Sequence, residues 1–216
     1  MVVSVIGFMD LLGTIAFAIS GALVGVKRDM DIFGVNILAV ITACGGGMTR
    51  DIVIGKEPPV MFVNPIYVLI AVITANVVFL YLCSNRRLPG SKRALNMLLF
   101  WCDTLGLAAF TVDGVFAGIQ IGLDRLFLCT FLGTVTGVGG GAIRDIFANQ
   151  MPEIFWKNIY AMASVPGAIL TVLAWRLLGS ENKAALIGGL CVILVRCIAV
   201  HYNWNLPRVP KQRGQS

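Results

Sequence analysis

Seven long apolar segments dominate this chain of 216 residues. They cover residues 5–26, 32–49, 60–83, 98–123, 126–143, 158–175 and 184–201. A helix that crosses a bilayer needs about 20 predominantly apolar residues, whereas the strands of a membrane barrel alternate in hydrophobicity over about 10 residues. Charged residues make up only 13% of the chain, against roughly 25% in soluble domains. The sequence therefore predicts an all-α polytopic membrane protein, with seven transmembrane helices in a single domain over residues 1–216.

The basic residues predict the orientation in the membrane, because cytoplasmic loops carry an excess of Lys and Arg. With seven spans, the segments after helices one, three and seven lie on the same side. They hold Lys27, Arg28, Arg86, Arg87, Lys92, Arg93, Arg208, Lys211 and Arg213. The opposite loops hold mainly Lys56, Arg125 and Lys183. We therefore expect the N-terminus outside and the C-terminus in the cytoplasm, in the inner membrane of a prokaryotic cell.

Several other classes of protein are disfavoured. The first apolar segment lacks the preceding basic residues of a signal peptide, so it is predicted to be a retained helix. The net charge of +6 is sorted by loop, which argues against nucleic-acid binding. The six cysteines show no CxxC spacing and are expected to be small buried hydrophobes. No catalytic or phosphate-binding motif is present, so the sequence predicts no enzyme, no cofactor and no structural metal.

The chain contains an internal repeat. Residues 10–25, DLLGTIAFAISGALVG, align with residues 103–118, DTLGLAAFTVDGVFAG, at a constant offset of 93 from Asp10 to Asp103. CGGGMTRD at 44–51 aligns with VGGGAIRD at 138–145 at an offset of 94 from Cys44 to Val138. These matches predict three-helix repeats at about residues 4–85 and 97–178, followed by a seventh helix at about 184–203. Three spans are an odd number, so the second copy enters the membrane from the opposite side, as in many transport proteins.

Each repeat carries three consecutive glycines in its second helix: Gly45, Gly46 and Gly47 in one copy, and Gly139, Gly140 and Gly141 in the other. Glycine destabilises a helix interior by about 1 kcal/mol relative to alanine. Such weak points are tolerated at membrane depth only where protein or a water-filled cavity surrounds them. We therefore predict that helices two and five kink at these glycines, beside a pathway. The alternative is that the glycines let helices approach closely, as small residues do in membranes.

An Arg-Asp pair follows each glycine run: Arg50 with Asp51, and Arg144 with Asp145. In one interpretation the arginines are ordinary interfacial charges whose side chains snorkel to water. In the other, which the symmetric placement slightly favours, the pairs are gate charges in the two vestibules of a pore. Adjacent residues of a helix do not face each other, so we expect the aspartates to cap turns or to pair elsewhere. Arg196 in the seventh helix is expected to snorkel.

Two helix faces combine small, aromatic and acidic side chains. Spacings of three and four residues place side chains on one helix face; the two faces are Asp10, Gly13, Phe17 and Ser20 in one copy, and Asp103, Gly106, Phe110 and Asp113 in the other. We expect both faces to point towards the protein interior and to line a pore. Asp113 lies mid-span, where a carboxylate costs about 3 kcal/mol; it is either a functional group or a buried structural acid.

The motifs GGGMTRD and GGGAIRD, in two three-helix repeats followed by a seventh helix, resemble the prokaryotic branch of the trimeric intracellular cation (TRIC) channel family. The same bacterial proteins carry a "glycine transporter" domain description. The resemblance covers about residues 4–205 and implies a homotrimer in membrane lipid, with an hourglass pore in each protomer that conducts K⁺ and some Na⁺. In animal members a basic and an acidic residue after the second glycine motif are associated with gating and lipid binding. Arg144 and Asp145 occupy that region here.

Two classes of function follow. The leading hypothesis is a passive channel for monovalent cations, in which kinked helices free carbonyl oxygens for the ion and Asp113 adds negative field. The positive charges of the two arginines favour anions instead, so the sequence does not decide between a cation pathway and an anion pathway. The rival is an alternating-access carrier for a small amino acid such as glycine, because inverted repeats with broken helices also build carriers.

Overall fold

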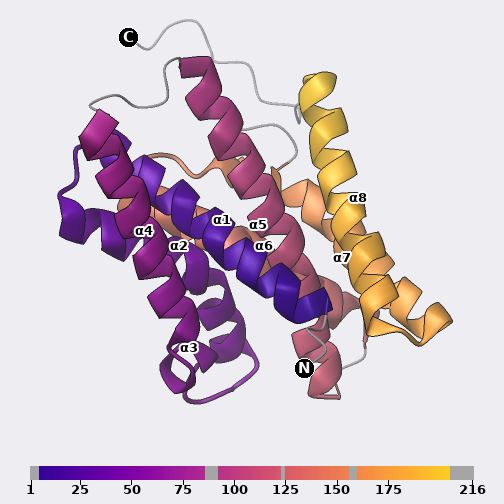
Figure 1. The fold of residues 1–216 in the computed structure, drawn as a ribbon. Coiled ribbons are helices and arrows are strands. Elements are labelled where there is room, and N and C mark those ends of the chain that lie inside the picture. Colours follow the sequence, from indigo (N-terminus) through magenta and orange to yellow (C-terminus); the bar gives the residue numbers. More distant parts are fainter. Residues whose placement is uncertain (1–4, 86–91, 123–124, 156–159, 205–216) are drawn as a thin grey trace, which may run out of the picture.

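The computed structural model describes residues 5–85, 92–122, 125–155 and 160–204, which contain helices and no strand (Figure 1). The helices are α1 (Val5–Lys27), α2 (Ile32–Val53), α3 (Val60–Val63), α4 (Ile66–Asn85), α5 (Lys92–Gln120), α6 (Leu126–Phe147), η1 (Glu153–Phe155), α7 (Tyr160–Leu178) and α8 (Glu181–His201). Seven of them are long and apolar enough to cross a membrane. The predicted all-α fold with seven spans is therefore confirmed.

Several boundaries differ from the predicted ones, among them the start of α5, which lies at Lys92 and not at residue 98, and two differences affect the charged residues or the third span. The predicted third span, 60–83, is interrupted at Asn64 and Pro65, so that the short α3 precedes the spanning helix α4. A proline lacks the backbone N–H that a helix interior needs, which explains the break. In addition, α2 and α6 continue beyond residues 49 and 143 and include both Arg-Asp pairs. Arg86, Arg87, Arg208, Lys211 and Arg213 lie outside the described residues, and the orientation in the membrane stays a prediction.

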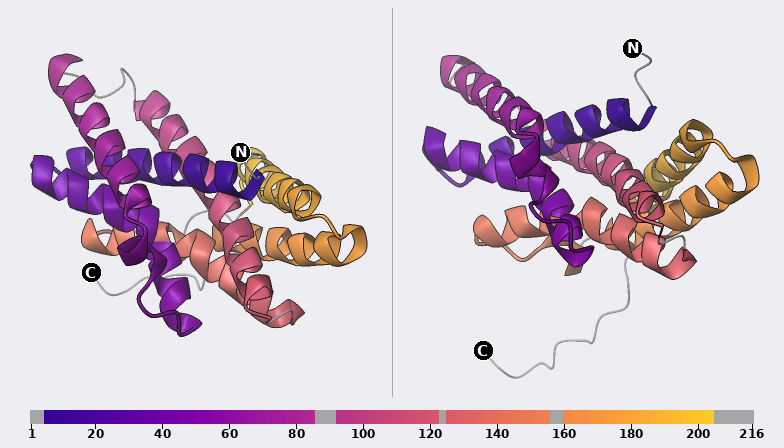
Figure 2. Two further views of the ribbon diagram at one scale, coloured as in Figure 1. Left: turned by 60° about the horizontal axis from the view of Figure 1, so that its bottom comes forward. Right: turned by 90° about the horizontal axis from the view of Figure 1, so that it is seen from below.

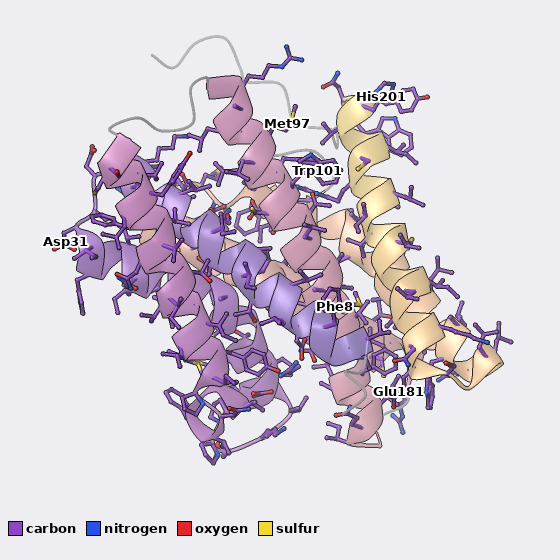
Figure 3. The ribbon with its side chains drawn as sticks, viewed as in Figure 1. Phe8, Asp31, Met97, Trp101, Glu181 and His201 are labelled. Atoms are coloured by element: carbon purple, nitrogen blue, oxygen red, sulfur yellow. The ribbon has the colours of Figure 1, made fainter. Side chains whose placement is uncertain are left out.

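The helices form two similar groups (Figures 1 and 2). In the first group α1, α2 and α4 pack against one another, and in the second α5, α6 and α7 do the same. Contacts of α1 with α5 and of α2 with α6 join the groups. Helix α8 packs against α7 and α5, at the edge of the molecule opposite α4, and Glu181 and His201 mark its two ends (Figure 3).

Equivalent contacts occur in both groups at the offsets of the sequence repeat. A Cβ atom placed on Gly21 would lie 2.7 Å from the Cα of Ala39 in α2, and one placed on Gly114 would lie 2.8 Å from the Cα of Gly133 in α6. Both glycines thus allow the same close approach of two helices. The left-handed turn residues also match, since Asp29 (φ 56°) corresponds to Gly122 (φ 77°). These pairs support the predicted repeat.

The glycine runs lie where α2 crosses α6, inside the protein. A Cβ atom on Gly46 would lie 2.1 Å from the carbonyl oxygen of Thr136, and one on Gly140 would lie 2.1 Å from that of Thr42. Two backbones therefore touch at this crossing, which supports the alternative that the glycines serve close approach. Both helices remain α-helical through their glycines. A bend of the helix axis there stays a prediction.

Alanine at the crossing should push the two helices apart. Overpacking costs typically 1–3 kcal/mol, so Gly46→Ala and Gly140→Ala are each expected to destabilise the protein by about 2 kcal/mol and to lower its melting temperature in detergent. Gly47→Ala is the control, because the Cβ would meet only Arg50 Nη2 at 3.7 Å and the change removes a helix-weakening glycine. Equal melting temperatures for the three variants would contradict the close crossing.

Candidate functional site

Each Arg-Asp pair forms a buried ion pair near the end of its helix. Arg50 Nε donates to Asp51 Oδ1 at 3.0 Å, and Arg144 Nε donates to Asp145 Oδ1 at 2.9 Å. The expectation that these neighbours do not face each other was wrong, because the long arginine side chain folds back to the carboxylate of the next residue. The arginines do not snorkel either, since Arg50 is 8% and Arg144 2% exposed.

The second carboxylate oxygen of each aspartate holds the segment that follows the helix. Asp51 Oδ2 accepts a hydrogen bond from the backbone N–H of Val60 at 2.8 Å, and Asp145 Oδ2 accepts one from that of Glu153 at 2.9 Å. Both acids therefore bridge their arginine to the start of the next short helix. This agrees with the expected role of the aspartates in local turns. It also fixes the guanidinium groups relative to the adjoining loops.

At one end of the bundle, which we call the sealed end, Arg144 is enclosed by α1 and α5. Its Nη1 lies 2.6 Å from Asp103 Oδ1 and also contacts Ser20 Oγ, and Ser20 Oγ donates to Asp103 Oδ1 at 2.8 Å. Ser20 is fully buried, Asp103 is 3% exposed and Asp145 is 1% exposed. The predicted candidates Ser20, Asp103, Arg144 and Asp145 thus form one buried network without access to water.

At the other end, the cavity end, Arg50 meets the two remaining predicted acids. Its Nη1 forms an ion pair with Asp113 Oδ2, and the side chain of Asp113 is 22% exposed. Oδ1 of Asp10 is buried and has no hydrogen-bond partner among the described residues. By the repeat offset Asp10 corresponds to Asp103, and Asp113 corresponds to Ser20. The cavity end therefore carries one carboxylate more than the sealed end at matching positions.

A cavity of about 240 Å³ opens at the cavity end. Its charged lining residues are Asp10, Asp51 and Asp113, against Arg50 and Lys56. The uncharged part of the lining comes from α1, α2, α3, α4 and α5 and from nearby turns. It includes Thr14, Cys44, Gly47, Tyr67, Phe110 and Gln120. Acidic side chains thus outnumber basic ones in the lining. A surplus of acidic groups in a cleft favours cations, and here that surplus is one side chain.

Two phenylalanines separate this cavity from the sealed end. Phe110 lines the cavity, and its ring centroid lies 5.3 Å from that of Phe17. Phe17 is fully buried and packs against the backbone of Gly106 and Gly140. The space between the two charged clusters is therefore filled by aromatic side chains and by the crossing of α2 and α6. The described part of the chain is closed at this point.

Arg196 behaves differently from the prediction. It is 4% exposed, so it does not snorkel. Its guanidinium carbon lies 5.1 Å from the ring centroid of Phe100 and 4.5 Å from that of Tyr160, and its Nε is 3.4 Å from Thr104 Oγ1. Cation–π contacts with two aromatic rings stabilise a buried guanidinium. The sequence offers no local signal for this stack, because its members come from three helices distant in the chain.

Other residues of the site were not predicted. Thr14, Lys56, Tyr67 and Gln120 line the cavity, yet none belongs to a glycine run or to the two acidic faces. Thr14 lies one position from the predicted face of α1, so a wider face would have included it. Among the described residues there is no group of three or more metal-ligating side chains suited to hold a metal ion.

Solved structures resemble this fold closely. The crystal structure of a prokaryotic TRIC channel in 0.5 M KCl matches with a TM-score of 0.83 and 30% identity, over 93% of this chain and 98% of that chain. The TRIC trimeric intracellular cation channel orthologue from Rhodobacter sphaeroides matches with a TM-score of 0.82 and 30% identity, over 93% and 99%. The resemblance inferred from the glycine motifs is confirmed.

Sequence relatives agree. A UPF0126 membrane protein of Deinococcus radiodurans is 36% identical over 94% of this chain and 93% of its own. The UPF0126 inner membrane protein YadS of Escherichia coli is 35% identical over 93% and 94%. The sequence profile described as "Glycine transporter" matches twice, at residues 7–82 and 100–176, once in each predicted repeat. The chain therefore belongs to this glycine transporter family, together with the UPF0126 membrane proteins.

Proposed function

We propose that the protein is a channel for monovalent cations, K⁺ and some Na⁺, with a pore in each protomer of a homotrimer. The observation that carries the proposal is the cavity end, where Asp10, Asp51 and Asp113 outnumber Arg50 and Lys56 within a fold shared with TRIC cation channels. Rings and clusters of acidic side chains select cations at the mouths of pores. The seven spans and the inner-membrane relative support a place in a prokaryotic inner membrane.

The proposed route runs from the cavity, past Phe110 and Phe17, to the network around Arg144. Because the aromatic pair and the crossing of α2 and α6 fill its centre, the structure corresponds to a non-conducting state. Opening requires the crossing at Gly46 and Gly140 to loosen. A helix with three glycines resists such a rearrangement less than an ordinary one, which supports the glycine runs as the moving parts.

In this proposal the Arg-Asp pairs are gate charges. Arg50 on α2 pairs with Asp113 on α5, and Arg144 on α6 pairs with Asp103 on α5. We call α2 and α6, which carry the glycine runs, the glycine helices. A shift of either glycine helix therefore breaks or remakes an ion pair. Removing one partner of a buried pair costs about 3–5 kcal/mol, so these contacts stabilise one helix position strongly. Membrane potential and lipid are the stimuli that act on such charges.

The alternating-access carrier remains the second candidate, and one observation favours it. The cavity is open at one end while the matching groups at the other end are buried, as expected of a carrier with an accessible site on one side only. A small amino acid such as glycine would fit a cavity of about 240 Å³. The same asymmetry also describes a channel with a shut gate.

Planar-bilayer recordings of the purified protein separate the two candidates. In a KCl gradient the channel is expected to give unitary ohmic current steps that reverse near the K⁺ equilibrium potential. A carrier turns over too slowly for unitary steps and would instead give saturable uptake of glycine into proteoliposomes. Steps that reverse near the Cl⁻ potential would establish an anion pathway, against the proposal.

The selectivity for cations over anions should depend on the acidic side chains of the cavity end, which outnumber the basic ones. Asp10→Asn removes a carboxylate whose Oδ1 has no hydrogen-bond partner in the described structure, so the ion pairs of Arg50 persist while the cavity loses negative field. We expect the K⁺/Cl⁻ permeability ratio to fall about fivefold, and Asp113→Asn to lower it as well. Glu181→Gln, an exposed change at the start of α8, is the charge-matched control. A reversal potential unchanged by both aspartate variants would remove this pair from the pathway.

A further inference from the structure

A chain of side-chain contacts closes the surface over the sealed end. Arg28, in the turn after α1, donates from Nη2 to Gln150 Oε1 at 3.1 Å. Gln150, in the turn after α6, donates from Nε2 to Asp145 Oδ1 at 2.8 Å. Asp145 is in turn the ion-pair partner of Arg144. The exposed turn after α1 is therefore linked through Gln150 to the buried charges.

Small apolar side chains pack directly beneath these contacts. Ala148, the C-cap of α6, is 3% exposed and forms a buried cluster with Val24 of α1 and Leu38 of α2. The turn after α6 is thus held against α1 and α2 by polar contacts outside and by apolar contacts inside. Ser20 and Asp103, which contact Arg144 on its inner side, are buried as well.

The matching positions at the cavity end cannot make the same contacts. By the repeat offsets, Arg28 corresponds to Ile121 and Gln150 corresponds to Lys56. Isoleucine offers no hydrogen-bonding group, and a lysine ammonium has no acceptor. Both residues line the open cavity, as do Ile54 and Ala117, which correspond to Ala148 and Val24. The groups that are packed and buried at one end thus line the cavity at the other.

We propose that Arg28 and Gln150 form a latch, which holds the turn after α6 against α1 and thereby keeps the sealed end closed. This inference rests on the proposed transport function and adds the contact that controls access to the pathway from that side. When the latch opens, the turn after α6 moves away from Val24, which then becomes accessible as the matching Ala117 is in the wall of the cavity. The latch residues position the gate and do not touch the transported ion.

The test measures access to a residue behind the latch. Val24→Cys places a thiol beneath Ala148, and its modification by a charged thiol reagent is followed at that position by peptide mass spectrometry, so that the native cysteines do not interfere. We expect Arg28→Ala to speed modification about fivefold, the effect of one lost hydrogen bond, and Gln150→Ala to speed it at least as much, because this change also removes the bond to Asp145. The double variant should be only slightly faster than Gln150→Ala, because in that variant Arg28 keeps just its longer contact with the carbonyl oxygen of Asn149, 3.5 Å away, and the two single changes share the rest of their effect.

Lys56→Ala is the matched control, since it removes the residue equivalent to Gln150 at the cavity end, and it should leave the rate at position 24 unchanged. Arg28 is exposed, so Arg28→Ala is expected to keep the melting temperature of the parent. Unchanged modification rates in folded Arg28→Ala and Gln150→Ala proteins would overturn the latch, as would equal acceleration by Lys56→Ala.

Cation flux through the same variants connects the latch to function. The open probability in bilayers should rise in Gln150→Ala and Arg28→Ala by a factor similar to that of the modification rate. Absence of current in the parent and in every variant would overturn the channel proposal, while the modification rates would still decide on the latch. Currents that rise without faster modification at position 24 would count against the latch alone.

Discussion

A guanidinium buried in an apolar bundle has to be neutralised, and this requirement sets the positions of most other elements here. Arg50 and Arg144 each take one carboxylate from the next residue and a second from α5. The adjacent aspartates also hold the loops that follow α2 and α6. Leaving either arginine without a partner would cost several kcal/mol. The glycine helices, α5 and two loops are therefore coupled through two ion-pair networks, and α1 joins one of them through Ser20.

The two networks are related by the repeat but are not equivalent, and the difference agrees with a cavity at one end of the bundle and buried charges at the other. At the sealed end the second position near the arginine is the neutral Ser20, and the pair of Arg144 is complete and buried. At the cavity end the same position is Asp113, and Asp10 adds a further carboxylate. Acidic groups close to one another are less costly where water can reach them than where they are buried, which agrees with the open cavity there.

Much of this structure could be predicted from the sequence, because its main signals are local. Hydropathy placed the seven helices, and the spacing of Asp10, Phe17, Asp103 and Phe110 identified the inward faces. The pairing of Arg50 with Asp51 was missed because it depends on side-chain conformation, and the stack of Arg196 on Phe100 and Tyr160 depends on contacts between distant helices. The repeat suggested two similar vestibules. Aligning the two repeats shows where the vestibules differ, at Ser20 against Asp113 and at Gln150 against Lys56. The effect of these differences on the two ends follows only from the side-chain contacts.

The exchange of a serine for an aspartate between the two halves has an electrical consequence. In a narrow passage the fixed charge at each mouth sets the local concentration of the permeant ion. Two carboxylates, Asp103 and Asp145, surround Arg144, whereas three, Asp10, Asp51 and Asp113, lie around Arg50, so in a conducting form cations would accumulate more at the cavity end. A conducting form of this protein would therefore rectify, passing larger currents when the voltage drives cations in from the cavity end. Two identical halves in inverted orientation would conduct symmetrically, and the positions that differ between them, Ser20 against Asp113 and Gln150 against Lys56, remove that symmetry.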